Sequence, residues 1–97
     1  MRIEILDKAE DDLVEGYQFY EDSEPGIGGY FLKNLYADID SLKLYAGIHR
    51  VVYRKYHRLL AKRFPFAVFY TIAHDTVFVH AVVDCRRSPA WIRQHLK

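Results

Sequence analysis

Residues 66–85 read FAVFYTIAHDTVFVHAVVDC, and this stretch decides the fold. Residues 66–73 are apolar at nearly every position, which is typical of a central strand that is covered on both faces. His74 and Asp75 then provide a tight turn, although it lacks the usual glycine. Residues 76–85 predict a second strand. One of its faces holds Val77, Val79, Ala81 and Val83, and the other holds Phe78, His80, Val82 and Asp84. The stretch therefore predicts an antiparallel pair of strands.

The neighbouring segments extend this sheet. Residues 57–63 predict a further strand, and Pro65 marks a bend after it because proline cannot donate to a sheet ladder. Residues 48–56 predict a connection with a possible short strand. On the other side, Pro89 suits the first turn of a helix, so residues 89–96 predict a short terminal helix.

The first half of the chain predicts a strand and two helices. Residues 2–6 favour a short strand, and residues 8–22 show apolar residues at helical spacing. Asp7 is the expected N-cap of this helix, with Glu10 placed three residues later as in a capping box. Residues 23–26 contain proline and glycine and should end the helix.

A second helix is expected over residues 27–44. Apolar side chains share one of its faces, and Gly47 is the expected C-terminal cap. Gly28 and Gly29 weaken its first turn by roughly 1 kcal/mol each relative to alanine, or else allow close packing against the first helix. The predicted fold is one α+β domain over residues 1–97, with a helical hairpin on a twisted, mainly antiparallel sheet in the order β-α-α-β-β-β-α.

Composition fits a protein that folds without cross-links or metals. Of its 97 residues, 51% are hydrophobic and only one, Cys85, is a cysteine, so no disulfide framework forms within the chain. The apolar stretch after Met1 is too short for a signal peptide, and no window approaches the ~20 apolar residues of a membrane-spanning helix. We therefore expect a cytoplasmic protein.

The net charge of +1 hides a strong asymmetry. Residues 1–40 contain eleven acidic and three basic residues, whereas residues 41–97 contain eleven basic residues and two acidic ones, Asp75 and Asp84. Such a division places a positive field over one part of the molecule, which suits an acidic partner. The alternative is a solvated basic face without a partner.

Two motifs resemble the RelE/ParE superfamily, the toxins of type II toxin–antitoxin modules. Residues 58–70, RLLAKRFPFAVFY, are similar to the central strands of that superfamily, and residues 79–89, VHAVVDCRRSP, are similar to its final strand with an Arg-Arg-x-Pro ending. The helical hairpin, with Ala9, Leu13 and Phe31 in the expected places, extends the resemblance across nearly the whole chain.

The resemblance implies a function as a growth-inhibiting toxin that a cognate antitoxin neutralises. ParE-like members poison DNA gyrase, and RelE-like members cleave mRNA in the ribosomal A site. A third possibility is a non-toxic module that serves only as an antitoxin-binding co-repressor. Plasmid stabilisation is among the roles that such modules have.

Basic residues are the candidates for contacting the antitoxin or the target. If residues 57–63 form a strand, Arg58 and Lys62 share one face and His57 and Arg63 the other. Arg86 and Arg87 match the family's Arg-Arg position and are the favoured site, although one of them is equally suited to an ion pair with the acidic half. The full candidate binding set is Arg54, Lys55, Arg58, Lys62, Arg63, Arg86, Arg87 and Trp91.

The C-terminal region departs from the nuclease pattern. Nuclease-type members carry a tyrosine or histidine there, whereas this chain has Trp91, which cannot exchange a proton, and His95, which we expect on a solvent-facing side of the last helix. RNA cleavage needs a general base, cations and a general acid. If the chain is a nuclease, the candidate catalytic residues are Arg58, Lys62, Arg86, Arg87 and His95. The departure favours the ParE-like interpretation and leaves the catalytic residues unknown.

The sequence predicts no metal and no cofactor. The five histidines and Cys85 lack ligand spacing such as Cys-x2-Cys, and no glycine-rich phosphate loop is present. His80, on an apolar strand, is expected to be a hydrogen-bonded core residue.

Overall fold

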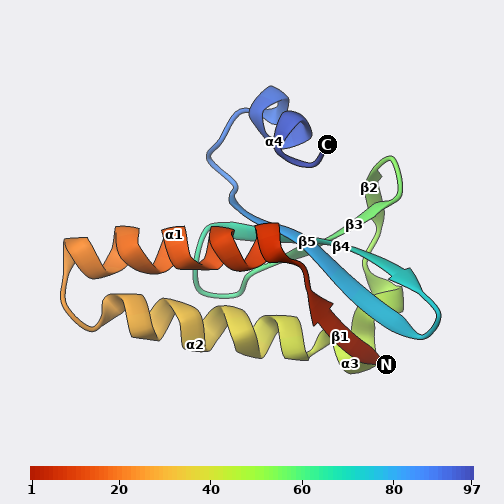
Figure 1. The fold of residues 1–97 in the computed structure, drawn as a ribbon, viewed down its shortest axis with the longest axis horizontal. Coiled ribbons are helices and arrows are strands. Elements are labelled where there is room, and N and C mark those ends of the chain that lie inside the picture. The colour runs from red at the N-terminus through yellow and green to blue at the C-terminus, as the bar shows by residue number, and fades with distance from the viewer.

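The computed structural model describes residues 1–97, which form a helical layer, a five-stranded sheet and a separate terminal helix (Figure 1). The elements follow in the order β1 (Arg2–Ile5), α1 (Asp7–Ser23), α2 (Ile27–Asp40), α3 (Leu42–Tyr45), the 3₁₀ turn η1 (Ala46–Ile48), β2 (Val51–Tyr53), β3 (Tyr56–Leu60), β4 (Phe66–Ala73), β5 (Thr76–Asp84) and α4 (Pro89–His95).

The sheet has the strand order β1-β5-β4-β3-β2. Three of its four pairings are antiparallel, and β1 runs parallel to β5, with Ile3 opposite Val77 and Ile5 opposite Val79. The predicted α+β class and the mainly antiparallel sheet are therefore confirmed. The possible short strand before β3 is present as β2, which makes the sheet one strand wider than the predicted element order.

The helical hairpin forms without the predicted capping box. Leu6 occupies the N-cap of α1 and no side chain caps this end, so the prediction of Asp7 as N-cap is wrong. Asp7 is instead the first helical residue, where its negative charge interacts favourably with the positive end of the helix dipole. A side-chain cap occurs at the next helix, where the Glu21 carboxylate accepts hydrogen bonds from the backbone N–H groups of Gly26 and Gly28.

Two glycines let α1 and α2 approach closely. A Cβ on Gly16 would lie 2.5 Å from the ring of Phe31, and a Cβ on Gly28 would lie 2.7 Å from the carbonyl oxygen of Tyr17. Gly29 has open space beside it. Close packing therefore explains Gly28, as the sequence allowed, but does not explain Gly29.

The second predicted helix is interrupted. Instead of running to Leu44, α2 ends at Asp40, and Ser41 separates it from α3 while its hydroxyl donates to the carbonyl oxygen of Asp38 at 2.6 Å. Gly47 is not the C-terminal cap, because it lies within η1 and does not have a positive φ. The apolar spacing continues through Leu42, which is fully buried, so the sequence pattern does not reveal the break.

The hairpin between β4 and β5 confirms the prediction from the central stretch. β4 has the predicted bounds, and His74 and Asp75 adopt positive φ values of 52° and 59°, which match a type I′ turn made without glycine. The predicted strand over residues 57–63 is shorter than expected. β3 ends at Leu60, so Lys62 and Arg63 lie in the bend before β4.

A β-bulge at His80 changes which side chains of β5 face the helices. Tyr70 pairs with Val79 and Phe69 pairs with Ala81, which leaves His80 as the extra residue. Val77, Val79 and Val82 consequently pack in the main core with the helical hairpin, whereas Ala81 and Val83 pack in the smaller core under α4. The predicted simple alternation of these valines is wrong beyond the bulge.

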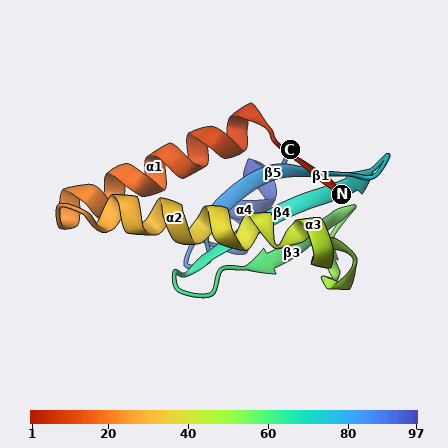
Figure 2. The same cartoon turned by 90° about the horizontal axis from the view of Figure 1, so that it is seen from below.

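The sheet is covered unequally on its two faces. Viewed from below, α2 crosses in front of the sheet and α4 lies behind it (Figure 2). The main core joins the sheet to α1 and α2, while Ile92 and Leu96 of the terminal segment cover the smaller core. No helix combines the length and the apolar character needed to cross a membrane.

Candidate functional site

A cleft of about 400 Å³ lies between α1, the end of β5 and α4. We call it the Arg87 cleft. Its lining includes Asp12, Phe19, Asp84, Arg86, Arg87 and Trp91, so it brings together three of the predicted binding residues and a buried carboxylate from α1.

Arg86 is already paired within the chain. Its Nη2 atom lies 2.6 Å from Oδ2 of Asp84 and its Nε atom lies 2.9 Å from Oδ1, while its backbone N–H also donates to Asp84. The hydrogen-bonded Arg86 guanidinium holds the pKa of Asp84 below its usual value. The sequence allows either partner binding or an internal ion pair for Arg86 and Arg87, and Arg86 forms the ion pair. Its partner is Asp84 at the end of β5, not a carboxylate of the acidic helices.

Arg87 is positioned by an aromatic ring instead of a carboxylate. Its guanidinium carbon lies 4.2 Å from the centroid of the Trp91 ring, and Arg87 takes part in none of the ion pairs of the structure. The Ser88 hydroxyl caps α4 by accepting the backbone N–H of Trp91, which fixes the start of the helix that carries the indole. Arg87 is thus a pre-positioned, exposed cation without an acidic partner.

The Trp91 ring also stacks on His95. The ring centroids are 4.6 Å apart and the planes differ by 14°. The indole therefore contacts both a guanidinium and an imidazole, which reduces the ring surface available for stacking on a nucleic-acid base.

His95 is bound to a buried carboxylate. Its Nε2 atom lies 2.8 Å from Oδ1 of Asp12, and Oδ2 of Asp12 accepts the backbone N–H of Val82 at 2.9 Å. The expectation that His95 faces solvent is therefore wrong, since its side chain is only 19% exposed. Burial raises the pKa of Asp12, and the hydrogen bonds from Val82 and His95 oppose this effect.

Arg54 and Lys55 form the turn between β2 and β3, away from the Arg87 cleft. Arg54 lies over the ring of Tyr53 and Lys55 over the ring of Tyr56. A second cleft of about 350 Å³ joins these four residues to Leu96 and Lys97 at the end of the chain.

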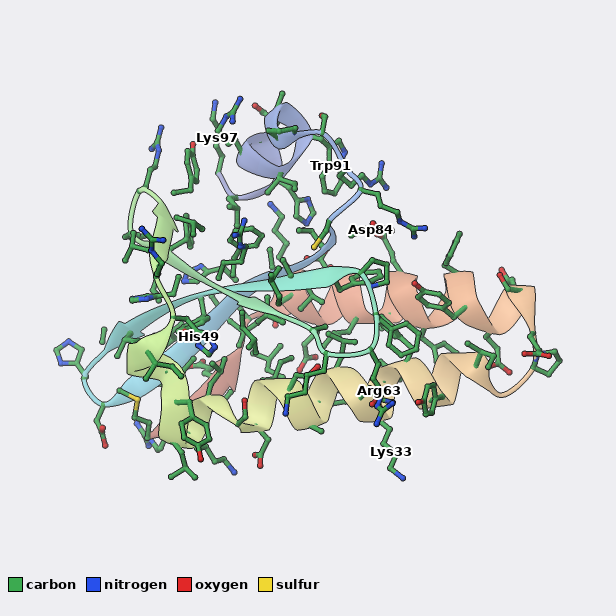
Figure 3. The ribbon with its side chains drawn as sticks, turned by 180° about the vertical axis from the view of Figure 1, so that it is seen from behind. Lys33, His49, Arg63, Asp84, Trp91 and Lys97 are labelled. Carbon is green, nitrogen blue, oxygen red and sulfur yellow. The ribbon has the colours of Figure 1, made fainter.

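The remaining predicted cations lie on different surfaces. Arg58 lies on β3 opposite Phe69, where its charge opposes the rise in the pKa of the Cys85 thiol that burial causes. The backbone N–H of Lys62 donates to the buried carboxylate of Asp38. Arg63 lies in the bend after β3, far from Trp91 (Figure 3). The prediction that Arg58 and Lys62 share one strand face is wrong, because the strand ends between them.

The histidines do not assemble a metal centre. No three side chains of His, Cys, Asp or Glu converge in the structure. His80 is half-buried with its Nε2 atom 2.8 Å from the hydroxyl of Thr71, which confirms it as a hydrogen-bonded core residue. Burial lowers the pKa of His80, and Lys55 adds to this effect.

Asp12 is the site residue that the sequence did not predict. Its position in the first turns of a helix already has a sufficient explanation in the helix dipole, and its partners lie 70 and 83 residues away. No local pattern in the sequence indicates that it is buried.

Comparison with known proteins identifies the fold. No family model and no curated protein matches the chain. A chain in the structure of the chromosomal ParDE TA (toxin–antitoxin) system from P. aeruginosa superimposes with a TM-score of 0.80 at 16% identity, covering 87% of this chain and 95% of that one. The chain has a ParDE-type fold. This confirms the architecture that the RelE/ParE resemblance predicts.

Proposed function

We propose that this chain is the toxin of a type II toxin–antitoxin module and that it inhibits growth by binding an essential protein target. The favoured target is a gyrase-type topoisomerase, and a cognate antitoxin neutralises the toxin. The ParDE-type fold supports this class of function, and the charge asymmetry of the sequence suits an acidic antitoxin segment.

The observation that carries the proposal is that Arg87 stacks on Trp91 and forms no ion pair. An arginine held over an indole and outside any ion pair is a typical anchor for a protein partner, because its charge is available and little side-chain entropy remains to be lost on binding. Phe19, which is 58% exposed, adds apolar area to the same cleft.

A second candidate function is ribosome-dependent mRNA cleavage, which the His95–Asp12 pair favours. A histidine oriented by a carboxylate is a common general base. However, the Nε2 atom of His95 is occupied by Asp12 and one face of its ring is covered by Trp91. This arrangement suits a fixed structural contact better than proton transfer, so we rank it second.

Induced expression in a cell that lacks the antitoxin tests the proposal. We expect growth arrest with induction of the DNA-damage response and trapped, cleaved DNA. Rapid translation arrest with cut mRNA on ribosomes would instead establish the nuclease, and normal growth would leave only the antitoxin-binding co-repressor. A short adjacent reading frame encoding a DNA-binding protein would independently support the module.

A further inference from the structure

The strand β2 is an uncovered edge of the sheet with an unusual composition. It is the last strand in the sheet order, opposite the edge formed by β1. Four apolar side chains on or near it are exposed, namely Ile48 (73%), Val51 (52%), Val52 (42%) and Leu60 (55%). Free backbone groups of an edge strand pair readily with another chain, and native proteins limit this pairing with short or bulged edges. β2 has three residues and a register shift between Val51 and Tyr53, so the segment that it offers for pairing is short.

The register shows which backbone groups of β2 are free. The backbone N–H of Arg58 donates to the carbonyl oxygen of Arg50, and Val51 lies opposite His57. In an antiparallel ladder, a residue next to a hydrogen-bonded pair directs its own N–H and C=O away from the partner strand. The N–H and C=O of Val51 therefore point outward from the sheet edge.

The charge around this edge has one sign. A cleft of about 360 Å³ beside β2 is lined by Arg50, Val52, Arg58 and Leu60 among others. Residues 41–74 contain no acidic side chain, and neither Arg50 nor Arg58 takes part in an ion pair of the structure. Pairing of β2 with the same strand of a second copy would bring these cations together, which disfavours self-association.

We propose that β2 binds an extended acidic segment of a partner protein, which adds to the sheet as a sixth strand. Backbone hydrogen bonds to Val51 provide affinity, as in other cases of strand addition. Because side chains alternate between the two faces of a sheet, acidic residues at every second position of the segment lie on the face of Arg50 and Arg58, and the intervening apolar residues lie on the face of Val51. This surface lies at the end of the molecule that carries His49, away from Asp84 and Trp91 (Figure 3), so it is separate from the Arg87 cleft.

The test is an NMR titration of the isotope-labelled full chain with a capped peptide of alternating glutamate and valine. We expect the amide signals of residues 50–53 to shift. Val51→Pro, which removes the outward donor but suits an edge position, should weaken binding about tenfold, as expected for the loss of backbone hydrogen bonds. Val51→Thr keeps the donor and should bind like the wild type, and so should Arg87→Ala, which separates this inference from the proposed function.

Further variants keep the proposal falsifiable if Val51→Pro does not fold. The double variant Arg50→Glu with Arg58→Glu should lose the glutamate peptide and bind a lysine–valine peptide. The proposal is overturned if the glutamate peptide leaves residues 50–53 unshifted or binds both variants as it binds the wild type. It is also overturned if a single-stranded oligonucleotide binds the same residues more tightly, or if the chain dimerises through β2.

Discussion

The Nε2 atom of His95 lies 2.8 Å from a carboxylate oxygen of Asp12, so a residue of the last helix is bound to a residue of the first. The same carboxylate also holds the strand just after the bulge at His80 through the N–H of Val82. One side chain thereby joins α1, β5 and α4, the three elements that form the Arg87 cleft.

The first prediction concerns the stability that Asp12 provides. Asp12→Ala leaves the buried N–H of Val82 without an acceptor, so we expect a loss of about 1–3 kcal/mol in the free energy of unfolding. Urea denaturation measures this loss, and hydrogen exchange at Val82 should accelerate. Asp11→Ala, at an exposed neighbouring position, is the matched control. Equal stability of the two variants would contradict the role of Asp12.

The second prediction concerns the two arginines of the cleft. Arg87→Ala should abolish toxicity and weaken antitoxin binding at least tenfold, since it removes the unpaired, pre-positioned cation. Arg86→Ala should have a smaller effect on binding, because the charge of Arg86 is already matched by Asp84. Calorimetry with purified antitoxin measures the binding of both variants, and Arg93→Ala is the control for an exposed arginine on the following helix, α4. Full toxicity of a folded Arg86→Ala, Arg87→Ala double variant would show that the site is elsewhere.

The third prediction concerns acid sensitivity. Arg86 holds the pKa of Asp84 below the ordinary value of 3.8, so the folded chain releases this proton more readily than the unfolded chain does. The pairing therefore stabilises the fold above about pH 4, and this contribution is lost as the pH falls through the folded-state pKa. We expect the urea midpoint of the wild type to fall more steeply below pH 4 than that of Asp84→Asn. Parallel curves for the two proteins would argue against the ion pair.

The fourth prediction separates two adjacent glycines. Gly28→Ala should destabilise the chain by about 1–3 kcal/mol, because the new methyl group would meet the backbone of α1. Gly29→Ala has open space and should stabilise α2 by up to about 1 kcal/mol. Thermal unfolding of the two variants tests this, and shifts of the same sign would refute the packing interpretation.

Local patterns predict most of the elements but few of the contacts in the site. β4, the turn at His74 and Asp75, and the helical hairpin follow from apolar spacing and turn residues. The break at Ser41 and the bulge at His80 do not follow from these patterns. Apolar residues continue on both sides of each irregularity, so the sequence does not show where the set of inward-facing positions changes. The bulge matters for the site, since it directs Val82 towards Asp12.

Charge patterns identify the basic half of the chain but do not distinguish its cations. Arg86 and Arg87 are adjacent and identical in sequence, yet one is bonded to a carboxylate and the other lies over an indole. That difference arises from the chain reversal between β5 and α4, which propensities do not specify. Lys62 and Arg63 lie beyond the end of β3, although the sequence predicts that the strand includes them.

The parallel pairing of β1 with β5 has a consequence for synthesis on the ribosome. Residues 2–5 find their partners only at residues 76–79, so the first strand cannot dock until more than three-quarters of the chain has been made. The helical hairpin is synthesised first, and its apolar face stays exposed until the strands that cover it have been translated. Folding is thereby delayed to the end of translation, and a truncated product that stops before β5 lacks both the strand that joins β1 to β4 and the Arg87 cleft.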